Sequence, residues 1–177
     1  MADQSNTIKA LHILAYGTVF GSNMHQTLLN GPMGLRVLPR AQFSHFQQNI
    51  FPPYFAIQSL LPAFLLWTLP KFKADRKSVV ALGTSFGLAV LNLVFVGPRT
   101  IRVLRKRTHQ ETKDKTRWDA PGPKSEDMKR LNWSFAVWHW FSFWMNNVGL
   151  VTLGWYGTLL AKGLLGQGIV KVFGTIY

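Results

Sequence analysis

The feature that most constrains this chain is the absence of acidic residues from four long apolar stretches. These stretches cover residues 8–29, 51–69, 78–96 and 135–165, and each is close to or above the roughly 20 residues that a helix needs to cross a bilayer. All seven Asp and Glu residues of the 177-residue chain lie outside them. Because a carboxylate is costly inside a bilayer, this distribution favours four membrane-spanning helices.

We therefore expect an all-α integral membrane protein, in which residues 1–177 form a single four-helix transmembrane domain. Gly31-Pro32 and Gly97-Pro98 are predicted to end the first and third spans, because Gly and Pro both disfavour a continuing helix. Residues 41–51 have the pattern of a short amphipathic helix that lies in the membrane interface. Pro52-Pro53 is then predicted to turn the chain into the second span.

Residues 99–132 are predicted to form a long basic connection between the third and fourth spans. Eleven of the 20 Lys and Arg residues lie between Arg99 and Arg130. The pattern indicates a basic helix that continues beyond the third span, a break at "DAPGPK" and a new helix capped by Ser125. Because basic loops stay in the cytosol, we expect the first and third loops there and both termini on the opposite side.

The formal net charge of +13 does not point to a nucleic-acid partner in this setting. A basic loop between membrane spans is more typical of a topology signal and of contact with anionic phospholipid headgroups. The expected partners are therefore the lipid bilayer and those headgroups, with a protein partner within a membrane complex as a further possibility. The sequence places the protein in a mitochondrial membrane or the endoplasmic reticulum without separating the two.

Several neutral polar residues are predicted to lie at membrane depth and to face the bundle interior. They are His12, Tyr16, Asn23, His139, Ser142 and Asn146. Interhelical hydrogen bonding explains such residues, because lipid offers them no partner. A polar cavity for a small molecule or a lipid headgroup is the second explanation, and the sequence leaves both interpretations open.

Enzymatic chemistry has little support in this pattern. No carboxylate lies at membrane depth to orient a histidine or to hold a metal ion, and the chain has no cysteine. No motif of a hydrolase, a metalloprotease or a nucleotide-binding protein occurs in a suitable context. We therefore expect no enzyme activity, no catalytic residue, no metal site and no cofactor.

Two pairs of glycines have the spacing of a close-packed helix contact. Gly17 and Gly21 form one such pair in the first span, and Gly83 and Gly87 form another in the third. Small residues at this spacing let a second helix approach closely in a membrane. We predict that both pairs are packing surfaces.

The stretch "LPRAQFSHFQQNIFPPYF" has the pattern of a membrane lip, the edge of the helix bundle at the membrane surface, rather than that of a polar loop. Arg40 and Arg99 are predicted to lie at the cytosolic lip, flanked by Gln47 and Tyr54. Two arginines at one lip can bind the phosphate of a headgroup, and these four residues are the ligand or headgroup candidates. Arginines at this position also act as topology anchors, and that alternative stays open.

Several of these motifs together resemble the transmembrane protein 205-like family, which carries the DUF4149 domain. The similar motifs are Leu11-His12, Phe20-Gly21-Ser22-Asn23-Met24, the stretch "LPRAQFSHFQQNIFPPYF", Pro98-Arg99-Thr100, and His139, Ser142 and Asn146 in an H-x-x-S-x-x-x-N pattern. The resemblance implies a four-helix integral membrane protein of eukaryotic membranes with no established activity. Gly97 stands where many relatives have an acid, which removes a local counter-ion for Arg99.

The function expected from the sequence is that of a non-catalytic multi-pass membrane protein, most simply a subunit or adaptor of a membrane complex. The alternative is binding or transport of a small molecule or lipid headgroup through the polar interior of the bundle. The first depends on outward helix faces, and the second on the interior residues and the two arginines.

Overall fold

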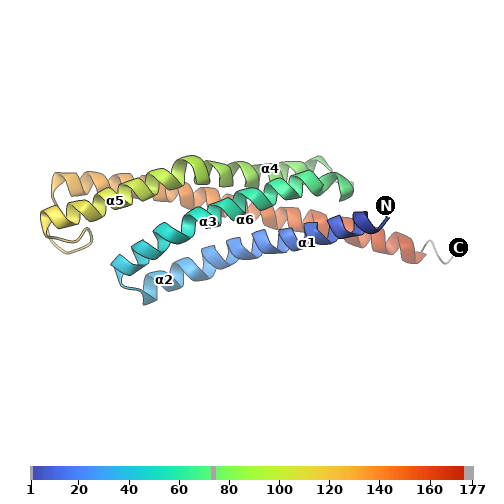
Figure 1. Cartoon of the computed structure of the whole chain (residues 1–177), viewed down its shortest axis with the longest axis horizontal. Coiled ribbons are helices and arrows are strands. Elements are labelled where there is room, and N and C mark those ends of the chain that lie inside the picture. The colour runs from blue at the N-terminus through green and yellow to red at the C-terminus, as the bar shows by residue number, and fades with distance from the viewer. Residues whose placement is uncertain (1, 73–74, 174–177) are drawn as a thin grey trace.

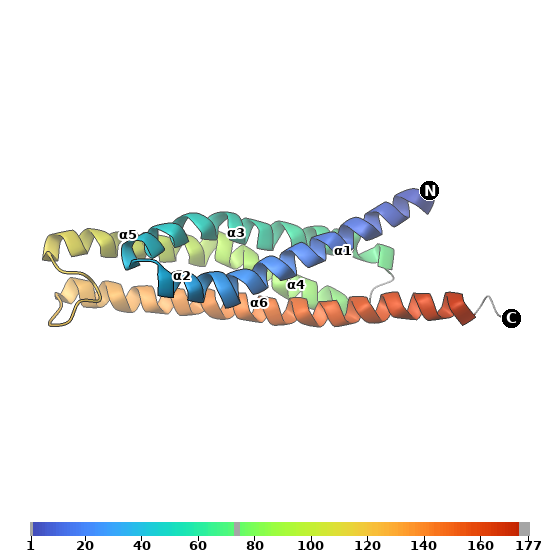
Figure 2. The ribbon, with the colours of Figure 1, turned by 90° about the horizontal axis from the view of Figure 1, so that it is seen from below.

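Long helices lie side by side in the computed structural model of the chain (Figure 1). The structure describes residues 2–72 and 75–173, and no strand occurs in this part of the chain. The main helices are α1 (Ala2–Met24), α3 (Arg40–Thr68), α4 (Arg76–Leu91) and α6 (Glu126–Phe173). Successive helices run in opposite directions, so both ends of the chain lie at the same end of the molecule (Figure 1, Figure 2).

The two Gly-Pro motifs do not end their helices, and that prediction was wrong. α1 continues through a π-helical turn, η1 (His25–Asn30), into α2 (Gly31–Val37). α4 continues in the same way through η3 (Asn92–Val96) into α5 (Gly97–Asp114). The wider π turn accommodates the proline, whose missing N–H and bulky ring would disrupt an ordinary α-helical turn.

Each π turn also explains why glycine precedes the proline. The Gly31 N–H donates to the Gln26 carbonyl, and the Gly97 N–H donates to the Asn92 carbonyl, five residues earlier in each case. A Cβ at Gly97 would lie 2.7 Å from the Asn92 oxygen, and one at Gly31 would lie 3.3 Å from the Gln26 oxygen. Glycine at position 97 is therefore needed for a close backbone approach rather than for a chain reversal, and glycine at position 31 eases a less tight one.

The separate interfacial helix before the second span is absent, because residues 41–51 belong to α3. The corner lies earlier, at Leu38-Pro39, and α3 contains Pro52, Pro53 and Pro62 without ending. Proline has a helical φ angle, and neighbouring groups in a membrane bundle can compensate for its missing hydrogen bond. The predicted turn at Pro52-Pro53 was therefore wrong, whereas α3 does give way to a short 3₁₀ turn, η2 (Leu69–Phe72), at Pro70.

The basic connection is largely helical, as its sequence pattern predicted. α5 carries most of its cations and ends at Asp114, and Lys115 has the left-handed φ angle of 51° that terminates the helix. The Met128 N–H donates to Ser125 Oγ at 3.2 Å, which confirms Ser125 as the cap of α6. α6 then continues far beyond both limits predicted for the fourth span.

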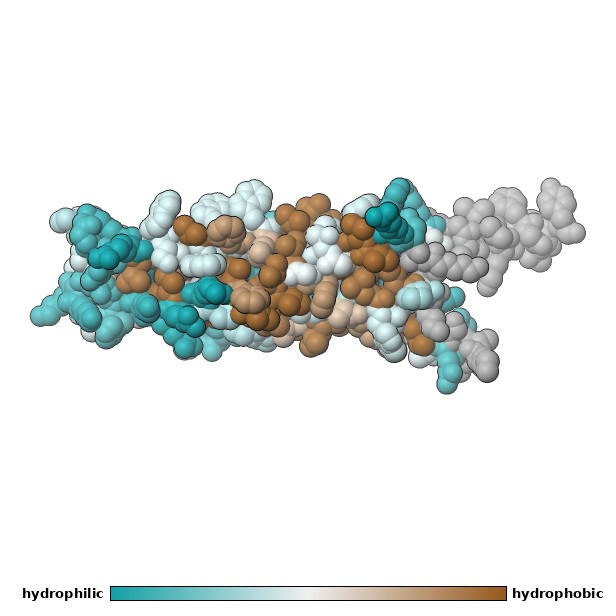
Figure 3. All heavy atoms as spheres, turned by 90° about the horizontal axis from the view of Figure 1, so that it is seen from above, coloured by the Kyte–Doolittle hydropathy of each residue, from teal (hydrophilic) through white to brown (hydrophobic). Residues whose placement is uncertain are grey.

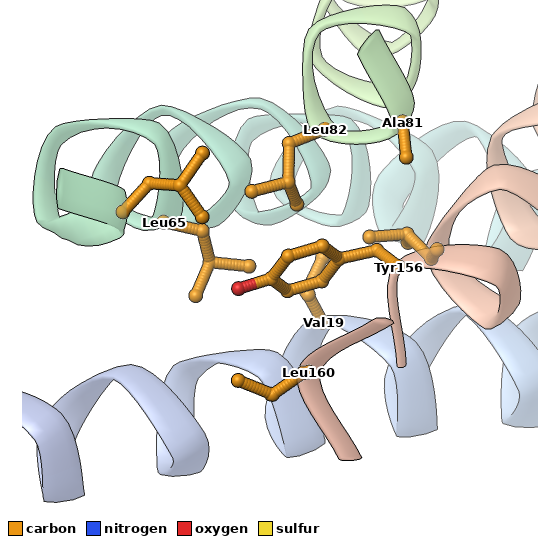
Figure 4. Close-up of a cluster of buried hydrophobic side chains, with 8 residues drawn as sticks. Val19, Leu65, Ala81, Leu82, Tyr156 and Leu160 are labelled. Atoms are coloured by element: carbon orange, nitrogen blue, oxygen red, sulfur yellow. The ribbon is translucent and has the colours of Figure 1, made fainter. Parts of the chain in front are cut away.

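The apolar core lies near the end of the bundle that carries the termini. Val19, Leu65, Leu82 and Tyr156 meet there, together with Leu160 (Figure 4). Much of the outer surface is also apolar, and it forms a hydrophobic middle between hydrophilic regions (Figure 3). Among the described residues, α3 and the continuous helix Arg76–Asp114 are long and apolar enough to cross a membrane.

Candidate functional site

A cavity of about 560 Å³ lies toward the end of the molecule opposite the termini. Two helical hairpins enclose it: η1, α2 and α3 on one side, and η3, α5 and α6 on the other. Its wall is mostly apolar and includes Phe43, Phe51, Phe55, Leu93 and Leu104. The volume lies within the roughly 300–1,000 Å³ that is usual for small-molecule sites.

The two π turns lie in the wall of this cavity, one from each hairpin. Gln26, Gly31 and Pro32 contribute from the first, and Asn92 with Gly97 contributes from the second. Proline has no N–H, so a carbonyl in the turn before it lacks a helical donor. π turns within α-helices frequently occur at functional sites, and here both of them border one cavity.

A network of neutral polar side chains closes the inner end of the cavity. The Tyr54 hydroxyl donates to Asn146 Oδ1 at 2.6 Å, and Asn146 Nδ2 donates to Thr27 Oγ1 at 2.8 Å. Asn23 Nδ2 in turn donates to Gln58 Oε1 at 3.2 Å. The network joins α1, α3 and α6, and it gives these buried polar groups hydrogen-bond partners inside the bundle.

Asn92 adds an acceptor that the network leaves unused. Its side chain is only 1% exposed, and its Oδ1 has no hydrogen-bond partner within residues 2–72 and 75–173. The amide Nδ2 makes a long contact of 3.4 Å with the Ser142 carbonyl. A buried acceptor without a partner is costly, so Asn92 is suited to a donor group on a bound molecule.

Arg107 is a buried cation in the opposite part of the cavity wall. Its side chain is 4% exposed, and the guanidinium carbon lies 4.0 Å from the ring centre of Trp118 and 4.2 Å from that of Phe135. Its Nε has no partner in the described part of the chain. Burial lowers the pKa of Arg107 from its ordinary value, and the negative charges of Glu111 and Asp119 act in the opposite direction.

The structure separates the four predicted ligand or headgroup candidates. Arg40 and Gln47 line the cavity, and Tyr54 is buried beside it with its hydroxyl on Asn146. Arg99 is exposed and does not line the cavity; its guanidinium lies over the rings of Phe95 and Trp138, 5.7 Å and 5.5 Å from their centres. The structure therefore does not bring Arg40 and Arg99 together in this cavity.

The predicted interior residues divide into two groups. His139, Ser142 and Asn146 line the cavity, and Asn23 hydrogen-bonds to Asn146 at its inner end. His12 and Tyr16 lie nearer the termini, beyond the core residue Val19. The ring nitrogens of His12 lie 2.5 Å from the hydroxyl oxygens of Thr68 and Tyr156, and the Tyr16 ring packs edge-on against Tyr156.

Within the described residues, neither glycine pair makes a close contact with another helix, so packing at these glycines is not seen inside this bundle. A Cβ added at Gly17, Gly21, Gly83 or Gly87 would meet no atom within 4 Å. Gly17 and Gly21 are exposed because the first helix turns its polar residues inward, which leaves the glycine face outside. The closest glycine contact in α6 is at Gly157, where an added Cβ would collide with the Tyr16 hydroxyl.

The sequence did not lead us to expect a site at Arg107, Trp118 and Phe135. Arg107 was treated as one of many cations in a basic connection. One signal pointed to it. Ile101, Leu104 and Arg107 recur at intervals of three on α5, so Arg107 shares the face that packs inward. Within the described residues, no three His, Cys, Asp or Glu side chains come together as a metal site.

Comparison with known proteins identifies the family. Residues 14–109 match the family described as "Domain of unknown function (DUF4149)". The chain belongs to the DUF4149 family. The matched region of this DUF4149 protein includes both π turns, all of α3 and Arg107, whereas Trp118 and the cavity residues of α6 lie beyond it. The finer resemblance to transmembrane protein 205-like proteins stays a prediction.

A curated relative matches most of the DUF4149 protein. "Xanthocillin biosynthesis cluster protein D" of Aspergillus fumigatus is 25% identical over 155 residues, which cover 87% of this chain and 89% of the relative. The similarity therefore extends beyond the DUF4149 match and into α6. No solved structure matches the chain.

Proposed function

We propose that this DUF4149 protein crosses the membrane four times and binds an amphiphilic small molecule or lipid in the cavity between its hairpins. The observation that carries the binding proposal is the cavity itself, about 560 Å³ with a mostly apolar wall and a few polar side chains. That combination is typical of small-molecule sites, where apolar surface gives affinity and polar groups give orientation.

In addition to the length and hydropathy of α3 and of the continuous helix Arg76–Asp114, the outward faces of α1 and α6 support the four crossings. Their polar residues point inward, as His12 and Asn23 do, whereas Leu14 and Val151 are 65% and 70% exposed. Such an arrangement is unfavourable in water and favourable in lipid. Hydropathy averaged along a helix does not show this arrangement, because the average does not distinguish the inward from the outward face.

The charge distribution supports the predicted orientation. The α2–α3 corner and the basic α5–α6 connection lie at the end of the bundle opposite the termini (Figure 1). Placing this end in the cytosol satisfies the tendency of basic loops to remain there. The cavity then lies near the cytosolic lip, where an amphiphile can enter with its polar end toward water.

The name of the Aspergillus relative places it in a biosynthesis cluster, and that context is compatible with handling of a small molecule. A subunit or adaptor role in a membrane complex is the rival proposal. Its support is the row of exposed aromatic side chains on α6, of which Trp133, Trp140 and Trp144 are examples. Aromatic residues of this kind also settle at membrane interfaces without any protein partner.

The test is native mass spectrometry of the protein purified in mild detergent, with Ser142→Trp as the variant. Ser142 lines the cavity, so an indole there occupies the space of a bound molecule. We expect the wild type to carry an amphiphile at one copy per chain and Ser142→Trp to have lost it. Val151→Trp is the matched control, because Val151 lies on the outward face of the same helix.

Two results would contradict the proposal. A wild-type protein without any bound amphiphile, even after addition of lipid, would show that the cavity is not a binding site. Equal retention of the amphiphile by Ser142→Trp and Val151→Trp would place binding elsewhere. A stoichiometric protein partner combined with an empty cavity would favour the adaptor role.

A further inference from the structure

We infer that the cavity is specific for amphiphiles with an anionic headgroup, and that Arg107 is the residue that binds the anion. This inference rests on the proposed binding function and adds the chemical class of the ligand. The expected ligand has a carboxylate or phosphate at one end and an apolar body. Its anionic end lies against the guanidinium beside Trp118 and Phe135, and its apolar body extends along α3 toward Asn92.

The first support is that the guanidinium of Arg107 has no direct hydrogen-bond or ion-pair partner in the described residues, although Glu111 and Asp119 lie near enough to act on its charge. The side chain of Arg107 is only 4% exposed. A guanidinium has five N–H donors arranged to match a carboxylate or a phosphate. Burying such a group without an anion is unfavourable, and the cavity provides the space for one.

The nearby carboxylates do not fill this role, because other groups already bind them. Glu111 Oε1 accepts the backbone N–H of Trp118 at 2.9 Å, and Asp119 Oδ2 accepts from Arg117 Nη2 at 3.0 Å. These contacts fix the start of the α5–α6 connection and thereby hold the Trp118 ring over Arg107. The two acids therefore position the aromatic ring, and the donors of Arg107 remain for a ligand.

The two rings hold the guanidinium without using its N–H groups. A cation above an aromatic face is stabilised by the ring quadrupole, and the N–H groups point outward from the guanidinium in its own plane. Trp118 comes from the connection and Phe135 from α6, so both clamp Arg107 against the cavity wall. This preorganisation limits the loss of side-chain entropy when an anion binds.

The other cations of the region are less suited to a buried anion. Arg40 lines the cavity but is exposed to solvent, where an ion pair contributes little. Arg102 is an exposed cation on the same helix and does not line the cavity. Arg107 is thus the cation that combines burial, fixed geometry and contact with the cavity.

The experiment compares binding of oleate and of oleyl alcohol to the full chain in detergent, by isothermal titration. The two probes share their apolar chain and differ in the charge of the headgroup. We expect the wild type to bind oleate about ten- to hundredfold more tightly, the usual effect of a hydrogen-bonded charge. Arg107→Gln should bind both probes with similar affinity, and Arg102→Gln should retain the preference.

The outcomes separate this inference from the proposed function. Equal wild-type affinity for the two probes would overturn the anion site and leave the cavity function in place. Binding of neither probe would overturn the proposed function as well. The wild-type comparison decides the question even where Arg107→Gln is poorly folded. A preference for oleate that Arg107→Gln retains in folded form would also overturn the assignment.

A competition arm identifies the source of the ligand. Phosphatidic acid incorporated in nanodiscs and free oleate in solution present the same chemistry, an anion on an apolar chain. Displacement of a fluorescent fatty acid by phosphatidic acid would support the inference with a bilayer lipid as ligand. Displacement by free oleate alone would support it with a soluble fatty acid as ligand.

Discussion

At the scale of single residues, the interior of the protein contains two polar clusters with apolar packing between them. One cluster surrounds Asn146 at the inner end of the cavity, and the other surrounds His12 near the termini. Val19, Leu65 and Leu82 pack in the core that lies toward the His12 cluster (Figure 4). This packing closes the bundle on the side away from the cavity, which favours binding from one side over passage through the molecule.

The His12 cluster gives a direct test of its structural role. Tyr156→Phe removes the hydroxyl that lies 2.5 Å from His12 Nε2, with little change in volume. We expect a loss of about 1 kcal/mol in the free energy of unfolding, the usual worth of an interhelical hydrogen bond in a membrane protein. Thermal unfolding in detergent measures this loss of stability.

Thr158→Val is the control, because the exposed Thr158 hydroxyl bonds to a carbonyl of its own helix. An equal loss of stability in both variants would contradict the role assigned to the His12 cluster.

The residues of this interior could be predicted only in part. His12, Asn23 and Asn146 were found because polar side chains in an apolar stretch must face inward. Arg107 was not found, because its environment depends on Trp118 and Phe135, which belong to other segments of the chain. A cation in a basic helix is usually solvated, and only tertiary contact distinguishes this one from its neighbours.

At the scale of helices and turns, the main feature is a π turn followed by Gly-Pro in the first helix of each hairpin. Both turns place a polar residue, Gln26 or Asn92, in the cavity wall. The apolar stretches could be located from sequence because hydropathy is a local property. The Gly-Pro motifs were misread because the same dipeptide can either end an α-helix or follow a π turn. It follows a π turn where the glycine N–H donates to the carbonyl five residues earlier.

The π turn η3 makes Gly97, the glycine before its proline, hard to replace. In Gly97→Ala the new methyl carbon would lie 2.7 Å from the Asn92 carbonyl oxygen, so the backbone must shift. We expect a loss of about 1–3 kcal/mol in the free energy of unfolding, as for other overpacked sites. Thermal unfolding in detergent is the measurement, with bound oleate as a second readout because Asn92 lines the cavity.

Gly87→Ala is the matched control on the same helix. A methyl group there meets no atom within 4 Å, and alanine favours a helix by up to about 1 kcal/mol over glycine. This variant should be as stable as the wild type or slightly more so. If Gly97→Ala proved equally harmless, the close approach in η3 would not exist in the protein as purified.

At the scale of the whole molecule, the structure predicts a simple topology. The termini and the short α3–α4 connection lie at one end, and the basic connection lies at the other (Figure 1, Figure 2). The chain has no native cysteine, so single cysteines can report on each end without background. In sealed vesicles whose non-cytosolic face points outward, we expect an impermeant maleimide to label Asn6→Cys and to spare Thr112→Cys; both positions are exposed. Labelling of both before the vesicles are opened would contradict four crossings.

The most direct test of the whole account is the accessibility of Ser142→Cys, a position in the cavity wall, in oriented vesicles. We expect an impermeant maleimide to react from the side of the basic connection, not to react from the side of the termini, and to be blocked by oleate. Reaction from the side of the termini, or reaction that oleate leaves unchanged, would contradict a ligand cavity closed at that end.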